Sequence, residues 1–168
     1  MNPLETTASL RATGISEMYI KSVRSMKIDF TFKTKLKVAE KEALLDRGAS
    51  ENFIDMKTWE RLGIGRFRLP RPVPVHNMDG SHGTMNKQGK IEHYCWLRVK
   101  LNRQDERIKF YLTGLGKDEF ILGYPFLATF NPKINWTNTT ITDGEVEIET
   151  VGFRILQKQV GEIQRAAI

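Results

Sequence analysis

The sequence predicts an all-β domain with one or two short helices. Three stretches, residues 28–32, 91–101 and 108–112, alternate apolar and polar side chains with the period of a half-buried strand. Glycine, proline and asparagine mark turns between these stretches. Only two short segments carry the end signals of a helix. The chain of 168 residues has the length of a single domain with a real core.

Composition indicates a globular protein of the cell interior. Hydrophobic residues make up 40% and charged residues 27% of the chain. No apolar run approaches the roughly 18 residues that span a bilayer. The first 25 residues lack the apolar core of a secretory signal, and a lone cysteine, Cys95, fits a reducing compartment. We therefore expect an intracellular, cytoplasmic protein that does not bind a membrane.

The net charge of +6 raises the question of whether the domain binds nucleic acid. Lysine and arginine are spread along the chain with acidic residues among them, which favours solvated faces over a binding groove. We do not expect nucleic acid as a partner of this domain. A basic nucleic-acid adaptor is the weakest of three functional hypotheses, and it requires binding that falls steeply with added salt.

In chain order, residues 1–25 show no periodicity and are expected to form a flexible leader or a linker in a polyprotein. A strand follows from Met26, then a charged hairpin at Lys37–Glu42, then a short strand at Ala43–Asp46. We place the domain at residues 26–150. Residues 151–168 are expected to be a tail or a linker to a following domain.

The strand that ends at Asp46 is the centre of the functional argument. Apolar residues lead into this single acid, and Arg47, Gly48 and Ala49 follow it. A buried strand that delivers one carboxylate to a tight turn has this pattern, because glycine permits a bend that other residues resist. Ordinary turn chemistry explains an aspartate near a glycine equally well. The tripeptide Asp46-Arg47-Gly48 is therefore weak evidence alone and needs support from the rest of the chain.

The segments after this turn have distinct signals. Residues 55–62 read as a short helix capped by Asp55 and ended by Gly63. Three prolines then hold an extended run. Asp79, Gly80 and Ser81 follow at a strong turn signal between two extended runs, and we name them the candidate flap.

The second half of the chain begins with the clearest strand of the sequence. Its apolar side chains share one parity: Ile91, Cys95, Leu97, Val99 and Leu101. A turn at Asn102–Glu106 joins it to a partner strand, which makes a long antiparallel hairpin. Ile121, Leu122 and Gly123 then lead into a short helix that has Pro125 in its first turn and stops at Asn131.

This order of segments resembles the retropepsin-like aspartic proteases, especially those of gypsy-type (Ty3-like) retrotransposon Gag-Pol polyproteins. The resemblance covers roughly residues 26–137. The matching residues are Leu44, Leu45, Asp46, Gly48, Ala49, Phe53, Ile54, Asp55, Ile121, Leu122, Gly123 and the stretch from Phe130 to Trp136.

The resemblance implies a closed barrel that acts as a homodimer and hydrolyses peptide bonds in a retrotransposon polyprotein, in the cytoplasm or in virus-like particles. Two carboxylates are needed for this chemistry, and the chain has one candidate, so Asp46 of each protomer would form the dyad. Gly48 and Ala49 would shape the turn, and the candidate flap would hold an extended peptide. Ile121, Leu122 and Gly123 would support the turn from below. No cofactor is implied.

One position departs from the family, which has serine or threonine where this chain has Arg47. Arginine cannot accept a hydrogen bond, and a nearby cation lowers the pKa of an aspartate by about 1–3 units. Either the dimer interface opens locally, or Glu51 or Asp55 pairs with Arg47, or the side chain points away. The departure predicts weak activity. The alternative function is an inactive retropepsin-fold module for dimerisation or peptide binding.

The chain also holds four residues of types that bind metals: His76, His82, His93 and Cys95. Their spacing is looser than that of structural zinc sites. Cys95 has the parity of a packed residue. We expect no metal site.

Overall fold

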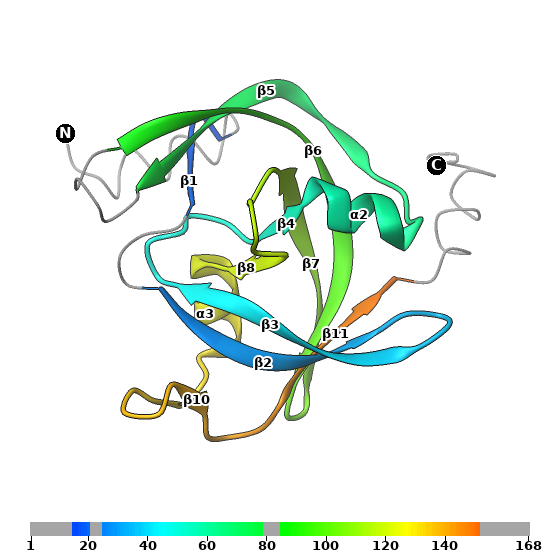
Figure 1. Cartoon of the computed structure of the whole chain (residues 1–168), viewed down its shortest axis with the longest axis vertical. Coiled ribbons are helices and arrows are strands. Elements are labelled where there is room, and N and C mark those ends of the chain that lie inside the picture. Colours follow the sequence, from blue (N-terminus) through cyan, green and yellow to red (C-terminus); the bar gives the residue numbers. More distant parts are fainter. Residues whose placement is uncertain (1–14, 21–24, 79–84, 152–168) are drawn as a thin grey trace.

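The computed structural model describes residues 15–20, 25–78 and 85–151 (Figure 1). Its elements, in chain order, are β1 (Met18–Ile20), β2 (Ser25–Lys33), β3 (Val38–Asp46), β4 (Phe53–Asp55), α2 (Met56–Leu62), β5 (Phe67–Met78), β6 (Met85–Leu101), β7 (Gln104–Thr113), β8 (Phe120–Leu122), α3 (Tyr124–Phe130), β9 (Ile134–Asn135), β10 (Thr140–Ile141) and β11 (Val146–Thr150). β9 and β10 pair with each other, and all other strands join one nine-stranded sheet.

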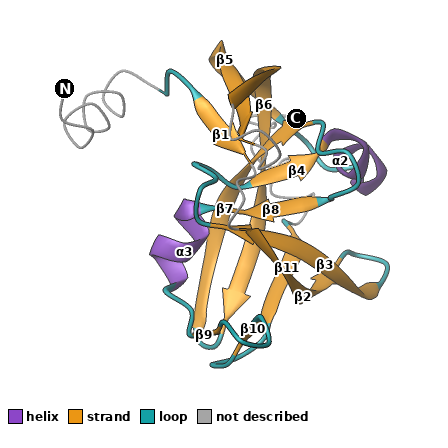
Figure 2. Cartoon of the chain, turned by 60° about the vertical axis from the view of Figure 1, so that its left-hand side comes forward, coloured by secondary structure: helices purple, strands orange, loops and turns teal. Residues whose placement is uncertain are grey.

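Most of this sheet closes into a barrel. The strand order is β1-β5-β6-β11-β2-β3-β8-β4-β7, and β7 also pairs with β6, so the ring from β6 to β7 is complete. β5 and β1 extend the sheet outside the ring. The predicted all-β closed barrel with one or two short helices is confirmed, and Figure 2 shows α2 and α3 on opposite sides of it. Neither described helix has the length and apolarity to cross a membrane.

Aromatic side chains from separate strands meet inside the barrel. Phe120 of β8 packs edge-on against Phe30 of β2 and Phe110 of β7, with ring centroids 5.2 and 6.2 Å apart. All three rings are buried, and edge-to-face packing adds to the stabilisation from burial. The interior therefore joins strands that are far apart in the sequence.

The strongest sequence patterns correspond to observed elements. β2 buries Ile28, Phe30 and Phe32, and all five predicted apolar residues of the long strand are buried in β6. Asp55 caps α2, because its Oδ2 accepts a hydrogen bond from the Lys57 amide at 3.1 Å. Gly63 ends this helix in the left-handed conformation, with φ of 66°.

Other expectations were wrong. Most of the predicted hairpin at Lys37–Glu42 belongs to β3, which starts at Val38 and pairs with β2 along its length. The charged side chains of this part face solvent on an outer stretch of the sheet, so no apolar alternation marked it as strand. Within the predicted leader, residues 18–20 form β1, which is too short to show a period. β11 was not predicted, and residues 152–168 lie outside the described part.

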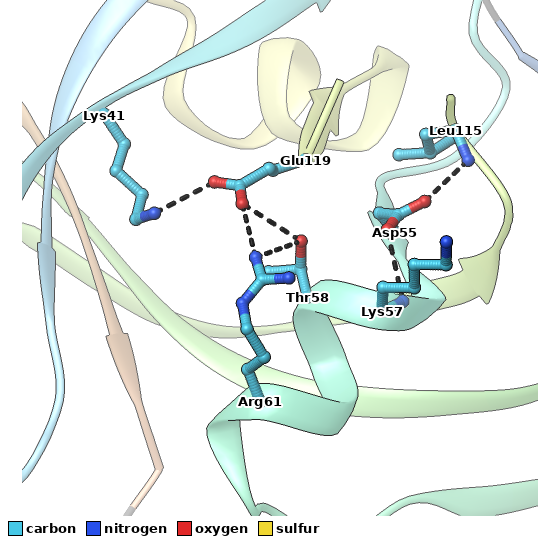
Figure 3. Close-up of polar contacts among 7 residues, drawn as sticks. All are labelled: Lys41, Asp55, Lys57, Thr58, Arg61, Leu115 and Glu119. Carbon is cyan, nitrogen blue, oxygen red and sulfur yellow. Dashed lines mark hydrogen bonds and ion pairs between the residues drawn. The ribbon is translucent and has the colours of Figure 1, made fainter. Parts of the chain in front are cut away.

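Glu119 holds α2 against the barrel through a small polar cluster (Figure 3). Its carboxylate lies 3.0 Å from Lys41 Nζ on β3 and 2.6 Å from Arg61 Nη2 on α2. Thr58 of α2 also donates a hydrogen bond to it, at 3.3 Å. Burial raises the pKa of Glu119, but its bonds to Lys41 together with the charge of Arg61 outweigh burial and leave the pKa below its ordinary value of 4.5.

This lowered pKa makes the cluster sensitive to acid. The ionised form is favoured by folding, so its contribution is present at neutral pH and is lost as the pH falls through the lowered pKa. We expect Glu119→Gln to reduce the free energy of unfolding at neutral pH by about 1 kcal/mol, because the cluster is partly solvent-exposed. The difference from the unmodified chain should vanish in acid. Urea unfolding at several pH values measures this.

The matched control is Glu60→Gln, the same change on the exposed surface of α2. A Glu119→Gln chain that loses equal stability at neutral and acidic pH would contradict the electrostatic account.

Candidate active site

Asp46 lies where a buried strand ends. β3 pairs with β2 on one side and with β8 on the other, where Leu44 and Leu45 are in register with Ile121 and Leu122. The Asp46 side chain is fully buried. Its Oδ1 accepts a hydrogen bond from the Gly48 amide at 2.8 Å, and its carbonyl accepts one from the Ala49 amide at 3.1 Å. These two bonds close a tight turn that holds the carboxylate in place.

The turn rests directly on the start of α3. The Tyr124 amide donates a hydrogen bond to the Ala49 carbonyl at 2.9 Å. A Cβ added at Gly123 would lie 2.7 Å from that same carbonyl and would also collide with the carbonyl of Glu51. The structure thus places Ile121, Leu122 and Gly123 against the turn. The glycine that the packing requires is Gly123, whereas Gly48 is not among the described glycines with a left-handed φ.

Asn52 is a site residue that the sequence analysis missed. It is buried, its Oδ1 accepts a hydrogen bond from the Gly123 amide at 2.8 Å, and its carbonyl accepts one from the Tyr111 amide at 2.9 Å. Asn52 therefore links the turn to β7 and β8. Its Nδ2 has no hydrogen-bond partner among the described residues. The sequence held no signal for this role, because the burial and the partners of Asn52 follow from tertiary packing.

Arg47 points away from the barrel interior and is exposed. Its guanidinium carbon lies 5.8 Å from the centre of the Trp136 ring, in the segment between β9 and β10. Stacking of this kind stabilises an exposed cation by about 0.5–1 kcal/mol. Of the alternatives left open by the sequence, this contact favours the outward-pointing arginine.

Asp55 binds backbone amides, whereas the sequence analysis considered it as a partner of Arg47. Its Oδ1 accepts a hydrogen bond from the buried Leu115 amide at 2.8 Å, and its Oδ2 accepts the cap bond of α2 (Figure 3). Both carboxylate oxygens thus hold backbone amides. The structure assigns Asp55 to the start of α2 and not to Arg47.

The candidate flap joins the two longest strands. β5 and β6 pair up to Met78 and Met85, and Figure 1 shows this hairpin arching over the rest of the chain. Asp79, Gly80 and Ser81 themselves lie outside the described residues. Their role stays a prediction.

Metal-binding residue types do not gather in the part of the chain that the structure describes. No group of three or more histidine, cysteine, aspartate or glutamate residues is placed to hold an ion there. Cys95 is buried in the barrel, and burial raises the pKa of its thiol to about 12. It is protonated at neutral pH and packs as an apolar residue.

Comparison with known families fits this geometry. The family model for the PEG10/RTL1 protease domain matches residues 42–150, which include the Asp46 turn, the hairpin of β5 and β6, and β8. The chain belongs to the PEG10/RTL1 protease domain family. The match supports the retropepsin-like protease resemblance, and the closed barrel agrees with it. No curated protein and no solved structure matches the chain.

The close approach of Gly123 yields a stability prediction for this protease domain. Gly123→Ala should lower the free energy of unfolding by about 1–3 kcal/mol, because two backbone carbonyls must move to admit the methyl group. Gly114→Ala is the matched control, since a Cβ there has no heavy atom within 4 Å. Urea denaturation of both variants measures the difference. Equal stabilities would show that the turn does not depend on this contact.

Proposed function

We propose that this PEG10/RTL1-type protease domain is an aspartic endopeptidase whose dyad consists of Asp46 from each of two copies of the chain. The observation that carries the proposal is the buried carboxylate of Asp46, held in a tight turn at a strand end. The protease family of the chain supports it.

The proposed chemistry needs two carboxylates that share one proton, because close like charges cannot both ionise. The ionised carboxylate takes a proton from water, which attacks the peptide carbonyl. The protonated one donates to the carbonyl oxygen. Collapse of the intermediate breaks the C–N bond as a proton passes to the leaving amine. The pair titrates as a unit, so activity should show a bell-shaped dependence on pH.

A second copy of the chain is required for this site. The sequence has one aspartate in such a turn, and a twofold axis beside Asp46 would bring two together. The peptide would lie extended under the hairpin of β5 and β6. By family resemblance, we propose a retrotransposon-type polyprotein as the substrate and the cytoplasm or a virus-like particle as the location.

Arg47 sets the expected level of activity. The family's hydroxyl is missing at this position, so the brace between the two turns of a dimer is missing too. The contact with Trp136 keeps the guanidinium on the outer surface, which reduces its effect on Asp46. We propose weak activity. The absent hydroxyl also favours a second candidate function, an inactive dimerisation or peptide-binding module.

Hydrolysis of a mixed peptide library from acidic to neutral pH tests the proposal. Asp46→Asn should reduce the rate at least about 100-fold, because it removes the acid and base of the mechanism. Arg47→Ser should raise the rate about tenfold or more, because it restores the hydroxyl that braces the two turns of the proposed dimer.

The variants also separate the two candidate functions. Cleavage by the unmodified chain that Asp46→Asn abolishes supports the endopeptidase. Cleavage by Arg47→Ser alone identifies a protease scaffold silenced at one position. If all three chains are folded dimers and none cleaves, the binding module replaces the enzyme.

A further inference from the structure

Strand β1 lies between β5 and the loop that follows Asp46, the two elements expected to contact a substrate under the proposed function. On one side it pairs in parallel with β5, with Met18 opposite Val75 and Ile20 opposite Asn77. On the other side it contacts the loop that follows Asp46. Figures 1 and 2 show β1 beneath the arch of β5, next to that loop.

The contact with the loop consists of two hydrogen bonds between the Tyr19 backbone and Ser50, one to the Ser50 amide and one to its side-chain hydroxyl. The Ser50 amide donates a hydrogen bond to the Tyr19 carbonyl at 2.8 Å. The Tyr19 amide donates one to Ser50 Oγ, also at 2.8 Å. Ser50 is four residues after Asp46. An extended segment with backbone bonds on both edges is bound as an added β-strand, a common mode of peptide recognition.

Alternate side chains of β1 are packed into an apolar cluster. Met18 and Ile20 are buried. They belong to a cluster that includes the site residues Ala49, Phe53 and Ile121. This cluster therefore contains two apolar side chains of β1 two residues apart, as expected for an extended peptide whose successive side chains face opposite sides.

Residues on the outer face of β1 hold it to β5. The Tyr19 ring stacks on His76, with centroids 5.5 Å apart. Glu17 Oε1 lies 2.5 Å from His76 Nε2. His76 is partly buried and Glu17 is exposed. This outer contact can therefore be altered without changing the side chains of the apolar cluster.

We propose that residues 15–20, which lie between β5 and Ser50, occupy the place of an extended peptide substrate and act as an internal substrate mimic. The ligand class is an extended peptide with apolar side chains at two positions separated by one residue. Added peptide must displace β1 before it binds. This inference rests on the proposed function, because it places the substrate next to the loop that follows Asp46.

Peptide binding by the full chain tests this inference, with Asp46→Asn present throughout so that nothing is cut. The probe is a fluorescein-labelled peptide with the sequence of residues 14–21, and fluorescence anisotropy gives its Kd. Glu17→Lys places a cation beside His76, and Tyr19→Pro removes the donor to Ser50 Oγ. Each change weakens the internal strand. Both should lower the Kd of the probe, by about tenfold for Tyr19→Pro. The reason is that β1 leaves its place between β5 and Ser50 in a larger fraction of molecules.

Glu60→Lys is the matched control, because it makes the same charge change on the exposed surface of α2. It should leave the Kd unchanged. Folded Glu17→Lys and Tyr19→Pro chains that bind the probe no better than their parent, or do not bind it, would overturn the proposal.

A second measurement tests displacement of β1 without the β1 variants, in case one of them fails to fold. Hydrogen exchange on the chain with β1 unaltered, at saturating probe, should show faster exchange at the Tyr19 and Ile20 amides and continued protection at Ser50. Bound probe with β1 still protected would refute displacement. Neither readout needs catalysis. Suppose the β1 variants bind the probe more tightly but no chain hydrolyses peptides in the library assay: only the proposed enzyme is then refuted. Suppose instead that the unmodified chain hydrolyses peptides but the β1 variants bind the probe no better: only the internal mimic is then refuted.

Discussion

The contact between the Asp46 turn and Gly123 is the constraint on which the rest of the site depends. β3 and β8 run in parallel beside each other, and α3 starts where the carbonyls of Ala49 and Glu51 approach closely. A side chain at Gly123 has no space there. Asn52 adds a hydrogen bond to the same glycine. One carboxylate is therefore held by backbone atoms, which move less than side chains do.

The barrel separates two groups of buried residues with different roles. The aromatic group inside the ring joins strands that are distant in the sequence. The second group lies around the Asp46 turn, β5 and β1. Its apolar surface is covered by a three-residue strand that pairs with β5 and is linked to one loop residue. Among the described strands, this one pairs with β5 alone, whereas each strand of the ring pairs with two neighbours, so fewer backbone bonds hold it.

Arg47 shows how a chain can accept a residue that its site disfavours. Its guanidinium stacks on Trp136, which keeps 58% of its surface exposed. The charge therefore stays at the protein surface and avoids the desolvation that burial beside Asp46 would require. The fold tolerates the substitution for this reason. The surface position of the charge means that Arg47 need not destabilise the barrel.

The sequence by itself determined the strands with long apolar alternation, both helix ends and the position of Asp46, because these follow from local periodicity and capping chemistry. It did not reveal β1 or β11, which pair with strands distant in the sequence, or the outer half of β3, whose charged side chains conceal the strand period. The tasks of Ser50, Asn52 and Asp55 were also decided by tertiary structure. Each bonds to a residue at least 31 positions away, and no local pattern encodes such a partner.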